Sequence, residues 1–184
     1  MDTVLLQRIS SGDHTAVSEL YDRHGRLLFS LIVRIVHDRA EAEEVLQEVF
    51  LSVWTKAHTY DSRLGSPMGW LVRLARNRAI DRLRALDART RAVEAMDEPG
   101  LGDNPEDAIV RNQERSRVRQ ALETLPAEQR QLIEQAYFRG LTHSELAKVF
   151  GLPLGTVKTR VRSGMQGLRA QLGVAGVRRS HQEA

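Results

Sequence analysis

The chain has 184 residues, enough for one ordinary domain or two small ones, and it contains no cysteine, which excludes disulfides and cysteine zinc sites. No apolar stretch reaches the roughly 18 residues of a membrane span. The N-terminus lacks the basic segment followed by an apolar segment that is typical of a signal peptide. These two features predict a cytoplasmic protein without membrane insertion. The net charge is +1 over residues 1–86, −5 over 87–110 and +7 over 111–184. The basic C-terminal part favours a polyanionic partner, with an ordinary solvated surface as the alternative.

The first helices are predicted from the spacing of apolar residues. These residues recur at helical intervals over 4–9 and again over 16–21. Gly12 and Asp13 separate the two short helices, and Asp13 is the expected N-cap of the second. Residues 27–36 are apolar nearly all round, which predicts a buried core helix.

Two further helices are rich in charged residues. The helix over 41–54 has one apolar stripe, and its opposite, acidic face holds Glu41, Glu43, Glu44, Gln47, Glu48 and Ser52. Residues 58–69 are predicted to form a loop, and a helix over about 70–86 follows. That helix carries Asn77, which can bind an exposed base edge, and only Asp81 opposes its arginines. The arginines, which can follow the phosphates of a strand, are Arg73, Arg76, Arg78, Arg82 and Arg84.

The middle of the chain is predicted to be a linker. Residues 87–110 are acidic and contain Pro99, Gly100, Gly102 and Pro105, which is turn chemistry rather than an amphipathic pattern. Helices over about 108–125 and 126–140 follow, and no run alternates as a half-buried strand does. We therefore expect an all-α fold of two small helical domains joined by a flexible linker. The expected segments are a domain at 1–86, the linker at 87–112, a second domain at 113–174 and a tail at 175–184.

A helix-turn-helix pattern lies near the C-terminal end. Thr142 and Glu145 form a capping box that begins the first helix, and Gly151 stands where that helix must end. The spacing of Ala147, Gly151 and Val157 fits the helix-turn-helix pattern. The small residue lets two helices cross closely, the glycine makes the turn, and the valine packs the second helix onto the first.

The outward positions of the second helix carry hydrogen-bond donors suited to phosphates and to base edges in the major groove. These positions are Thr156, Lys158, Thr159, Arg162 and Ser163. Arg160 departs from the pattern, since an inward apolar residue is usual there, and we expect its side chain to reach a phosphate. The pattern predicts DNA binding, with a plain two-helix hairpin as the alternative.

Two motif sets, in the correct order, resemble those of the extracytoplasmic-function (ECF) sigma factors of the sigma-70 superfamily. The resemblance spans roughly residues 4–172. The core helix of region 2 is matched by AEAEEVLQEVFLSVW, and the promoter-melting helix by WLVRLARNRAIDRLR. Region 4 is matched by LPAEQRQLIEQAYFRGLTHSELAKVFGLPLGTVKTRVRSGMQGLR. Region 3 is absent, as in this family. The family's usual Asp after Ala-Glu is Glu44 here, which keeps the charge.

The resemblance implies an RNA polymerase sigma factor that recognises −10 and −35 promoter elements and promotes DNA melting. It implies that Glu44, Gln47 and Glu48 bind the clamp helices of the polymerase β′ subunit, that region 4 meets the β flap, and that the helix-turn-helix reads the −35 element. The −10 and melting roles fall to Arg73, Arg76, Asn77 and Asp81, with residues 58–68 as the wall of a base pocket. An anti-sigma factor is a further implied partner.

Two other classes of protein are alternatives. One is a helix-turn-helix regulator whose N-terminal helical domain binds an effector or dimerises, but such a domain has no need for EEVLQEVF followed by an arginine-rich helix. The other is a DNA-acting enzyme such as a recombinase, which needs a nucleophile or a metal cluster. No such grouping stands out, and the six histidines form no ligand set. The sequence therefore predicts no catalytic residue, no metal and no cofactor.

Overall fold

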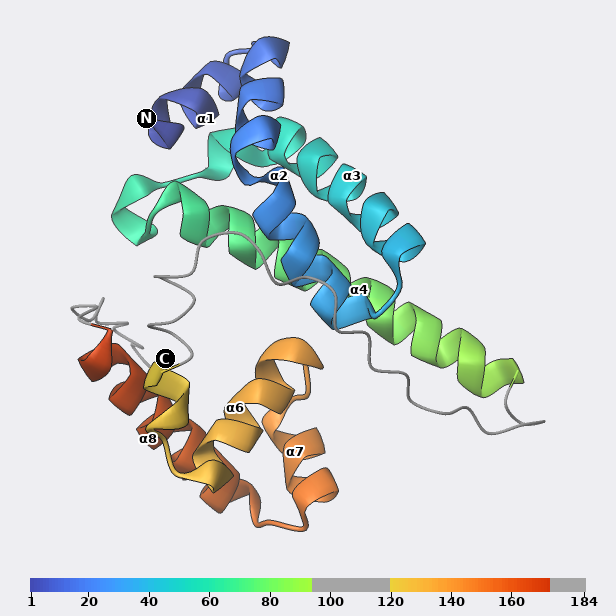
Figure 1. Cartoon of the computed structure of the whole chain (residues 1–184), viewed down its shortest axis with the longest axis vertical. Coiled ribbons are helices and arrows are strands. Elements are labelled where there is room, and N and C mark those ends of the chain that lie inside the picture. The colour runs from blue at the N-terminus through green and yellow to red at the C-terminus, as the bar shows by residue number, and fades with distance from the viewer. Residues whose placement is uncertain (94–119, 173–184) are drawn as a thin grey trace, which may run out of the picture. The chain divides into compact units, whose positions relative to one another are not determined.

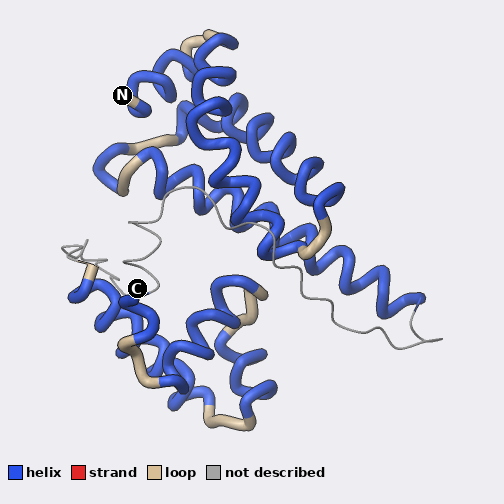
Figure 2. Tube along the Cα trace, viewed as in Figure 1, coloured by secondary structure: helices blue, strands red, loops and turns tan. Residues whose placement is uncertain are grey.

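The computed structural model of the protein describes residues 1–93 and 120–172 (Figure 1). Within these two ranges the chain is helical or forms short connections, and no residue lies in a strand (Figure 2). The chain divides into two compact units, Met1–Asn104 and Pro105–Ala184, and the boundary between them in the sequence falls within the predicted linker. The all-α fold of two helical domains is thereby confirmed. Most of the predicted linker and the whole predicted tail lie outside the described residues.

The first unit is built around three long helices that pack against one another, α2, α3 and α4 (Figure 1). Its core consists of aliphatic side chains, including the completely buried Leu28 and Ile32 of α2 and Val45 and Val49 of α3. Leu71 of α4 is also completely buried. In chain order the elements are α1 (Asp2–Ser10), α2 (His14–Val36), α3 (Arg39–Lys56), the 3-10 turns η1 (Ala57–Thr59) and η2 (Ser62–Leu64), and α4 (Pro67–Val93).

Helix α2 is continuous, whereas the sequence predicted a short helix over 16–21 and a separate one over 27–36. No proline interrupts the stretch between them, and Gly25, of a residue type that often ends helices, is instead buried within the helix. A Cβ at Gly25 would lie in ordinary contact with the Tyr21 ring, 3.5 Å away. The polar residues between the two predicted helices, Asp22, Arg23 and Arg26, therefore lie on the exposed side of one long helix.

Helix α4 is longer at both ends than the predicted range of 70–86. Proline is favoured in the first turn of a helix, where its missing N–H is not needed, so Pro67 begins α4 rather than ending the loop. The Ser66 hydroxyl accepts a hydrogen bond from the Gly69 amide at 3.1 Å, which caps the first turn. At the other end the helix runs to Val93, because no proline or glycine occurs before Pro99. Seven residues of the predicted linker are thus helical.

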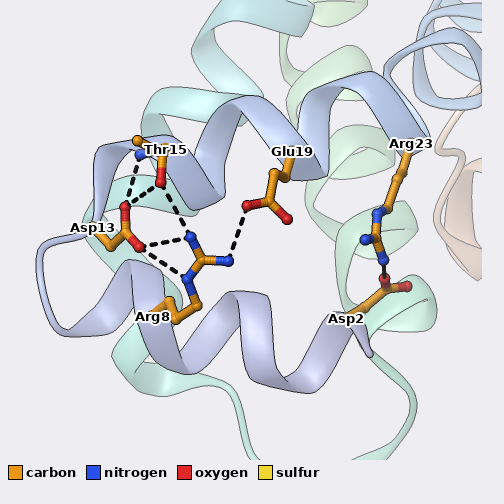
Figure 3. Close-up of polar contacts among 6 residues, drawn as sticks. All are labelled: Asp2, Arg8, Asp13, Thr15, Glu19 and Arg23. Atoms are coloured by element: carbon orange, nitrogen blue, oxygen red, sulfur yellow. Dashed lines mark hydrogen bonds and ion pairs between the residues drawn. The ribbon is translucent and has the colours of Figure 1, made fainter.

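Helix α1 is fastened to the start of α2 by a polar network around Arg8 (Figure 3). Arg8 donates hydrogen bonds to Asp13 and to Glu19, both at 2.9 Å. Asp13 is the N-cap of α2 as predicted, and its carboxylate accepts from the Thr15 backbone N–H at 2.9 Å. Hydrogen bonds from the Thr15 side chain and from Arg8 lower the pKa of Asp13 to about 2. The other end of α1 is tied to α2 by the ion pair between Asp2 and Arg23, at 3.3 Å.

In the described part of the second unit, α6, α7 and α8 and the helical residues 120–123 before them pack around two small apolar clusters. One cluster consists of Ala121, Leu125, Ile133 and Leu168, and the other of Leu132, Leu146 and Val157. Gly140 has a positive φ of 64° in the connection after the first of these helices. The helices are α6 (Ala127–Phe138), α7 (His143–Phe150) and α8 (Leu154–Gln171).

Candidate nucleic-acid interface

Helices α7 and α8 form the predicted helix-turn-helix. The Thr142 hydroxyl accepts from the Glu145 amide at 3.2 Å, and the Glu145 carboxylate accepts from the Thr142 amide at 2.7 Å, which completes the capping box. Gly151 ends α7 in the left-handed conformation, with φ of 62°. Leu146 and Val157 are completely buried and pack with Leu132 of α6. The turn and the crossing of the two helices are therefore fixed by the residues that the spacing singled out.

The exposed side of α8 presents most of the predicted DNA-binding residues. Lys158, Arg162 and Ser163 are exposed, and Thr156 is half-buried near the start of the helix. Thr159 is exposed too, but its hydroxyl donates to the Gly155 carbonyl at 2.9 Å, within its own helix. Contact with a base by the Thr159 hydroxyl would require that bond to be exchanged. Lys158 and Arg162 thus give this face its positive charge.

Arg160 is held inside the second unit. Its guanidinium forms an ion pair with Glu128 of α6 at 2.7 Å, and the side chain is partly buried. The sequence led us to expect that Arg160 reaches a phosphate, but the structure gives it a carboxylate partner from another helix. The pair joins α8 to α6, and it places one of the basic residues of α8 next to a negative charge.

Gly164 is a structural residue of α8 that the sequence reading missed. A Cβ at this position would lie 2.6 Å from Ile133 Cδ1 and 3.2 Å from Gln129 Cβ. The glycine therefore lets α8 and α6 approach closely. The available signal was a glycine in the interior of a helix, where it is unfavourable unless packing requires it.

The arginines of α4 do not all face the same way. Arg73 and Asn77 are exposed, Arg76 is half-buried and Asp81 is exposed. Arg82 is only 20% exposed and turns toward α3. The exposed polar face of α4 is therefore narrower than the sequence suggested.

Arg82 is shared by three carboxylates of α3. It lies 2.7 Å from Glu44 Oε2, 3.1 Å from Glu41 Oε2 and 3.3 Å from Glu48 Oε1. Arg78 adds a longer ion pair to Glu48, at 3.9 Å. The predicted docking residues Glu44 and Glu48 are thus already paired within the unit. The sequence did show three acidic residues one turn apart, but it could not show which cation meets them.

Two other residues complete the description of α3. Gln47 is exposed, as the docking prediction requires. Ser52, which the sequence placed on the acidic outer face, is instead buried, and its hydroxyl accepts from Arg78 at 3.4 Å. A small polar side chain fits the contact between α3 and α4, where its one oxygen still finds a donor.

The predicted loop at 58–69 is held by internal contacts. The Tyr60 hydroxyl donates to the Gly65 carbonyl at 3.0 Å, and the Tyr60 ring meets the Trp70 ring edge-on with centroids 6.1 Å apart. The Asp61 carboxylate accepts from the Arg63 amide at 2.9 Å, and the Arg63 side chain lowers the pKa of Asp61. These contacts give the loop a defined shape in the absence of any bound DNA strand.

No three His, Cys, Asp or Glu side chains in the ranges 1–93 and 120–172 are grouped so that they could hold a metal ion. In the same part of the chain, no helix is long and apolar enough to cross a membrane.

Comparisons with known proteins match both units. The family model for Sigma-70 region 2 matches residues 20–89, and the model for Sigma-70, region 4 matches residues 121–170. The ECF RNA polymerase sigma factor SigK of Mycobacterium sp. (strain KMS) is 35% identical over 176 residues, which cover 94% of this chain and 91% of the relative. SigK of Mycobacterium ulcerans (strain Agy99) is 37% identical, covering 90% of each chain.

A solved structure is also similar. Rhodobacter sphaeroides SigE, crystallised in complex with the anti-sigma ChrR, is 32% identical and has a TM-score of 0.47, with coverage of 92% of this chain and 97% of that one.

A sigma-70 region 2 followed by a region 4 with a helix-turn-helix defines a promoter-recognition subunit of bacterial transcription. The chain belongs to the ECF family of RNA polymerase sigma factors. It functions in transcription initiation, and sigma regions 2 and 4 bind core RNA polymerase and promoter DNA. The alternative, a regulator with an N-terminal effector or dimerisation domain, is not favoured, because the first unit is itself a sigma domain. Proteins of this family are DNA-recognition subunits.

Proposed function

We propose that three surfaces of the chain divide the work of initiation. The exposed side of α8 binds the −35 element as duplex, and the exposed side of α4 with the 58–68 loop binds the opened −10 strand. The outer face of α3 docks on the clamp helices of the polymerase β′ subunit. The observation that carries this proposal is that Lys158 and Arg162 lie exposed on the second helix of a helix-turn-helix whose first helix is capped at both ends.

The −35 role rests on the shape and chemistry of α8. A helix of this kind fits the major groove with its exposed residues toward the base edges. Arg162 can form a bidentate contact with guanine, and Lys158 can contact a base or a phosphate. Thr156 and Ser163 supply shorter donors at the two ends of the same exposed side, and Arg160 acts by holding α8 in place through Glu128.

The −10 role rests on the exposed residues of α4. Opening a duplex costs unpairing and unstacking free energy, and a protein that captures a displaced base offsets this cost. Arg73 can neutralise a phosphate of the displaced strand, and Asn77, one turn further along, can bind the edge of an unpaired base. Arg76 and Asp81 border this face, and Tyr60 stiffens the adjoining loop.

The docking role rests on α3. Glu44, Gln47 and Glu48 lie on neighbouring turns, and both carboxylates remain accessible although they contact Arg82. An acidic ridge of this kind is complementary to the arginines that the family resemblance places on the clamp helices.

The remaining assignments follow from these partners. Unit 2 meets the β flap, and an anti-sigma factor is a further partner. The chain works as a binding subunit without a catalytic residue or cofactor, and in the cytoplasm, where core polymerase and the chromosome are found.

The experiment that tests the proposal is transcription by reconstituted holoenzyme on two templates. Arg73→Ala with Asn77→Ala is expected to impair transcription from a closed duplex while leaving −35 binding nearly unchanged. A template with a pre-melted −10 bubble should restore part of the activity, because the protein no longer supplies the unpairing free energy. Arg26→Ala, at an exposed position of α2, is the control for loss of an arginine elsewhere. Equal defects on both templates would count against the melting role.

A further inference from the structure

The outer face of α3 carries one exposed leucine among polar residues. Glu44, Gln47 and Leu51 are all exposed and are spaced three and four residues apart, so they form one ridge along the helix. Leu51 is 66% exposed, while the neighbouring Val49 and Val53 are completely buried. A leucine here is not needed to form the helix, since arginine, lysine, glutamine and glutamate have similar helix propensities.

The charged residues of this ridge are already paired inside the chain. Arg82 contacts Glu44 at 2.7 Å and Glu48 at 3.3 Å. Docking on arginines of a partner would exchange these ion pairs for others of the same kind. Accessible ion pairs contribute little net free energy, and charge complementarity acts mainly on the rate and orientation of encounter. A long-lived complex therefore needs apolar burial on the same ridge, and apolar anchors at the centre of an interface supply it.

We propose that Leu51 is the apolar anchor of the α3 docking face and is buried against core RNA polymerase, with Glu44, Gln47 and Glu48 as the polar rim around it. The inference rests on the proposed docking function of this face, because Leu51 lies on the same ridge of α3 as the proposed docking residues. It assigns the two kinds of residue to different steps. The rim sets the association rate and its salt dependence, and Leu51 sets the dissociation rate.

The test measures binding of the full chain to core polymerase, without DNA, at low and high salt. Leu51→Gln and Leu51→Met have similar size and helix propensity but differ in polarity. Leu51→Gln is expected to dissociate about tenfold faster at both salt concentrations, while Leu51→Met stays close to the parent. Val4→Gln, at a 55% exposed position of α1, is the matched control and should bind like the parent. All three variants should keep the parent's melting temperature, because both positions are exposed.

The outcomes separate this inference from the proposal beneath it. Suppose that Leu51→Gln dissociates like the parent while the double variant Gln47→Lys with Glu48→Lys still loses binding. That result overturns the role of Leu51 and supports the docking face. Parent-like binding by the double lysine variant overturns the docking face, and the inference falls with it. If Leu51→Gln binds core polymerase normally but abolishes self-association of the parent in sedimentation, Leu51 belongs to a contact between two copies and the proposal is wrong.

Discussion

The two units hold their basic helices in different ways. In the first unit, Arg82 of α4 is surrounded by three carboxylates of α3, and Arg78 contacts the same helix. In the second, Arg160 pairs with Glu128, whereas Lys158 and Arg162 lie exposed on α8. At least two of the five arginines counted on α4, Arg78 and Arg82, therefore serve the contact between helices. A count of basic residues overstates the charge that α4 offers to DNA and describes α8 better.

The packing of the units differs as well. The first unit joins α2, α3 and α4 through many completely buried aliphatic side chains. The second has two small clusters and brings α8 against α6 at Gly164, where a side chain would collide with Ile133. A small domain with little apolar material gains stability from close approach of its helices. The following predictions test this contrast, from the largest expected effect to the smallest.

Charge reversal on the α3 ridge is the largest predicted change. Gln47→Lys with Glu48→Lys is expected to weaken core-polymerase binding about 100-fold or more, because the ridge would repel a basic partner. A pull-down or biosensor measurement with core enzyme checks this, and circular dichroism checks that the helices remain. Glu48→Gln is the control, since it removes the negative charge that faces Arg82 without adding a positive charge. Unimpaired binding by the folded double variant would refute the docking assignment.

Removal of Arg162, an exposed arginine of α8, is the second-largest predicted change. Arg162→Ala is expected to weaken −35 binding by about 1–3 kcal/mol if the contact is bidentate to a base, and the loss should vanish on sites where that base is changed. Holoenzyme binding to a set of base-substituted −35 sites measures this. Arg160→Ala is the contrast, because a residue tied to Glu128 should affect all sites alike. Equal weakening on every site by Arg162→Ala would move that residue to a phosphate.

The close approach of α8 and α6 gives the third prediction. Gly164→Ala is expected to destabilise the second unit by about 1 kcal/mol, because overpacking against Ile133 of about 1–3 kcal/mol exceeds the gain of about 1 kcal/mol in helix propensity. Gly155→Ala is the matched control, since nothing lies within 4 Å of a Cβ there. It should be neutral or stabilising by up to about 1 kcal/mol. Denaturant unfolding followed by circular dichroism compares the two, and equal stability would show that Ile133 moves aside.

The Arg8 network gives the smallest predicted effect, and it depends on pH. The pKa of Asp13 is lowered from 3.8 to about 2 in the folded chain, so its carboxylate stabilises the fold above the unfolded value and loses that contribution as the pH falls toward 2. Asp13→Asn keeps an N-cap but removes the charge facing Arg8. The melting temperature of the parent should exceed that of the variant at about pH 5, and the gap should close toward pH 2. A gap that is independent of pH would assign the effect to capping alone.

The sequence by itself determined the class of fold, most of the helices and the helix-turn-helix. These features depend on interactions within a few residues. The Thr142–Glu145 capping box, the left-handed Gly151 and the Asp13 N-cap each satisfy backbone groups of adjacent turns, so their spacing along the chain is sufficient. The family motifs are likewise contiguous, which is why the two sigma regions could be predicted in order.

Only the tertiary structure decided which side chains meet across helices. Arg82 lies 34 to 41 residues from the carboxylates that it binds, Arg160 lies 32 residues from Glu128, and Gly164 lies 31 residues from Ile133. Helical periodicity assigns a residue to a face but does not say what packs against that face. For this reason the sequence alone placed Ser52 on the surface, did not show the pairing of Arg160 with Glu128 and did not single out Leu51. The cross-helix contacts were needed to divide the charged residues into those that hold the fold and those that remain available to a partner.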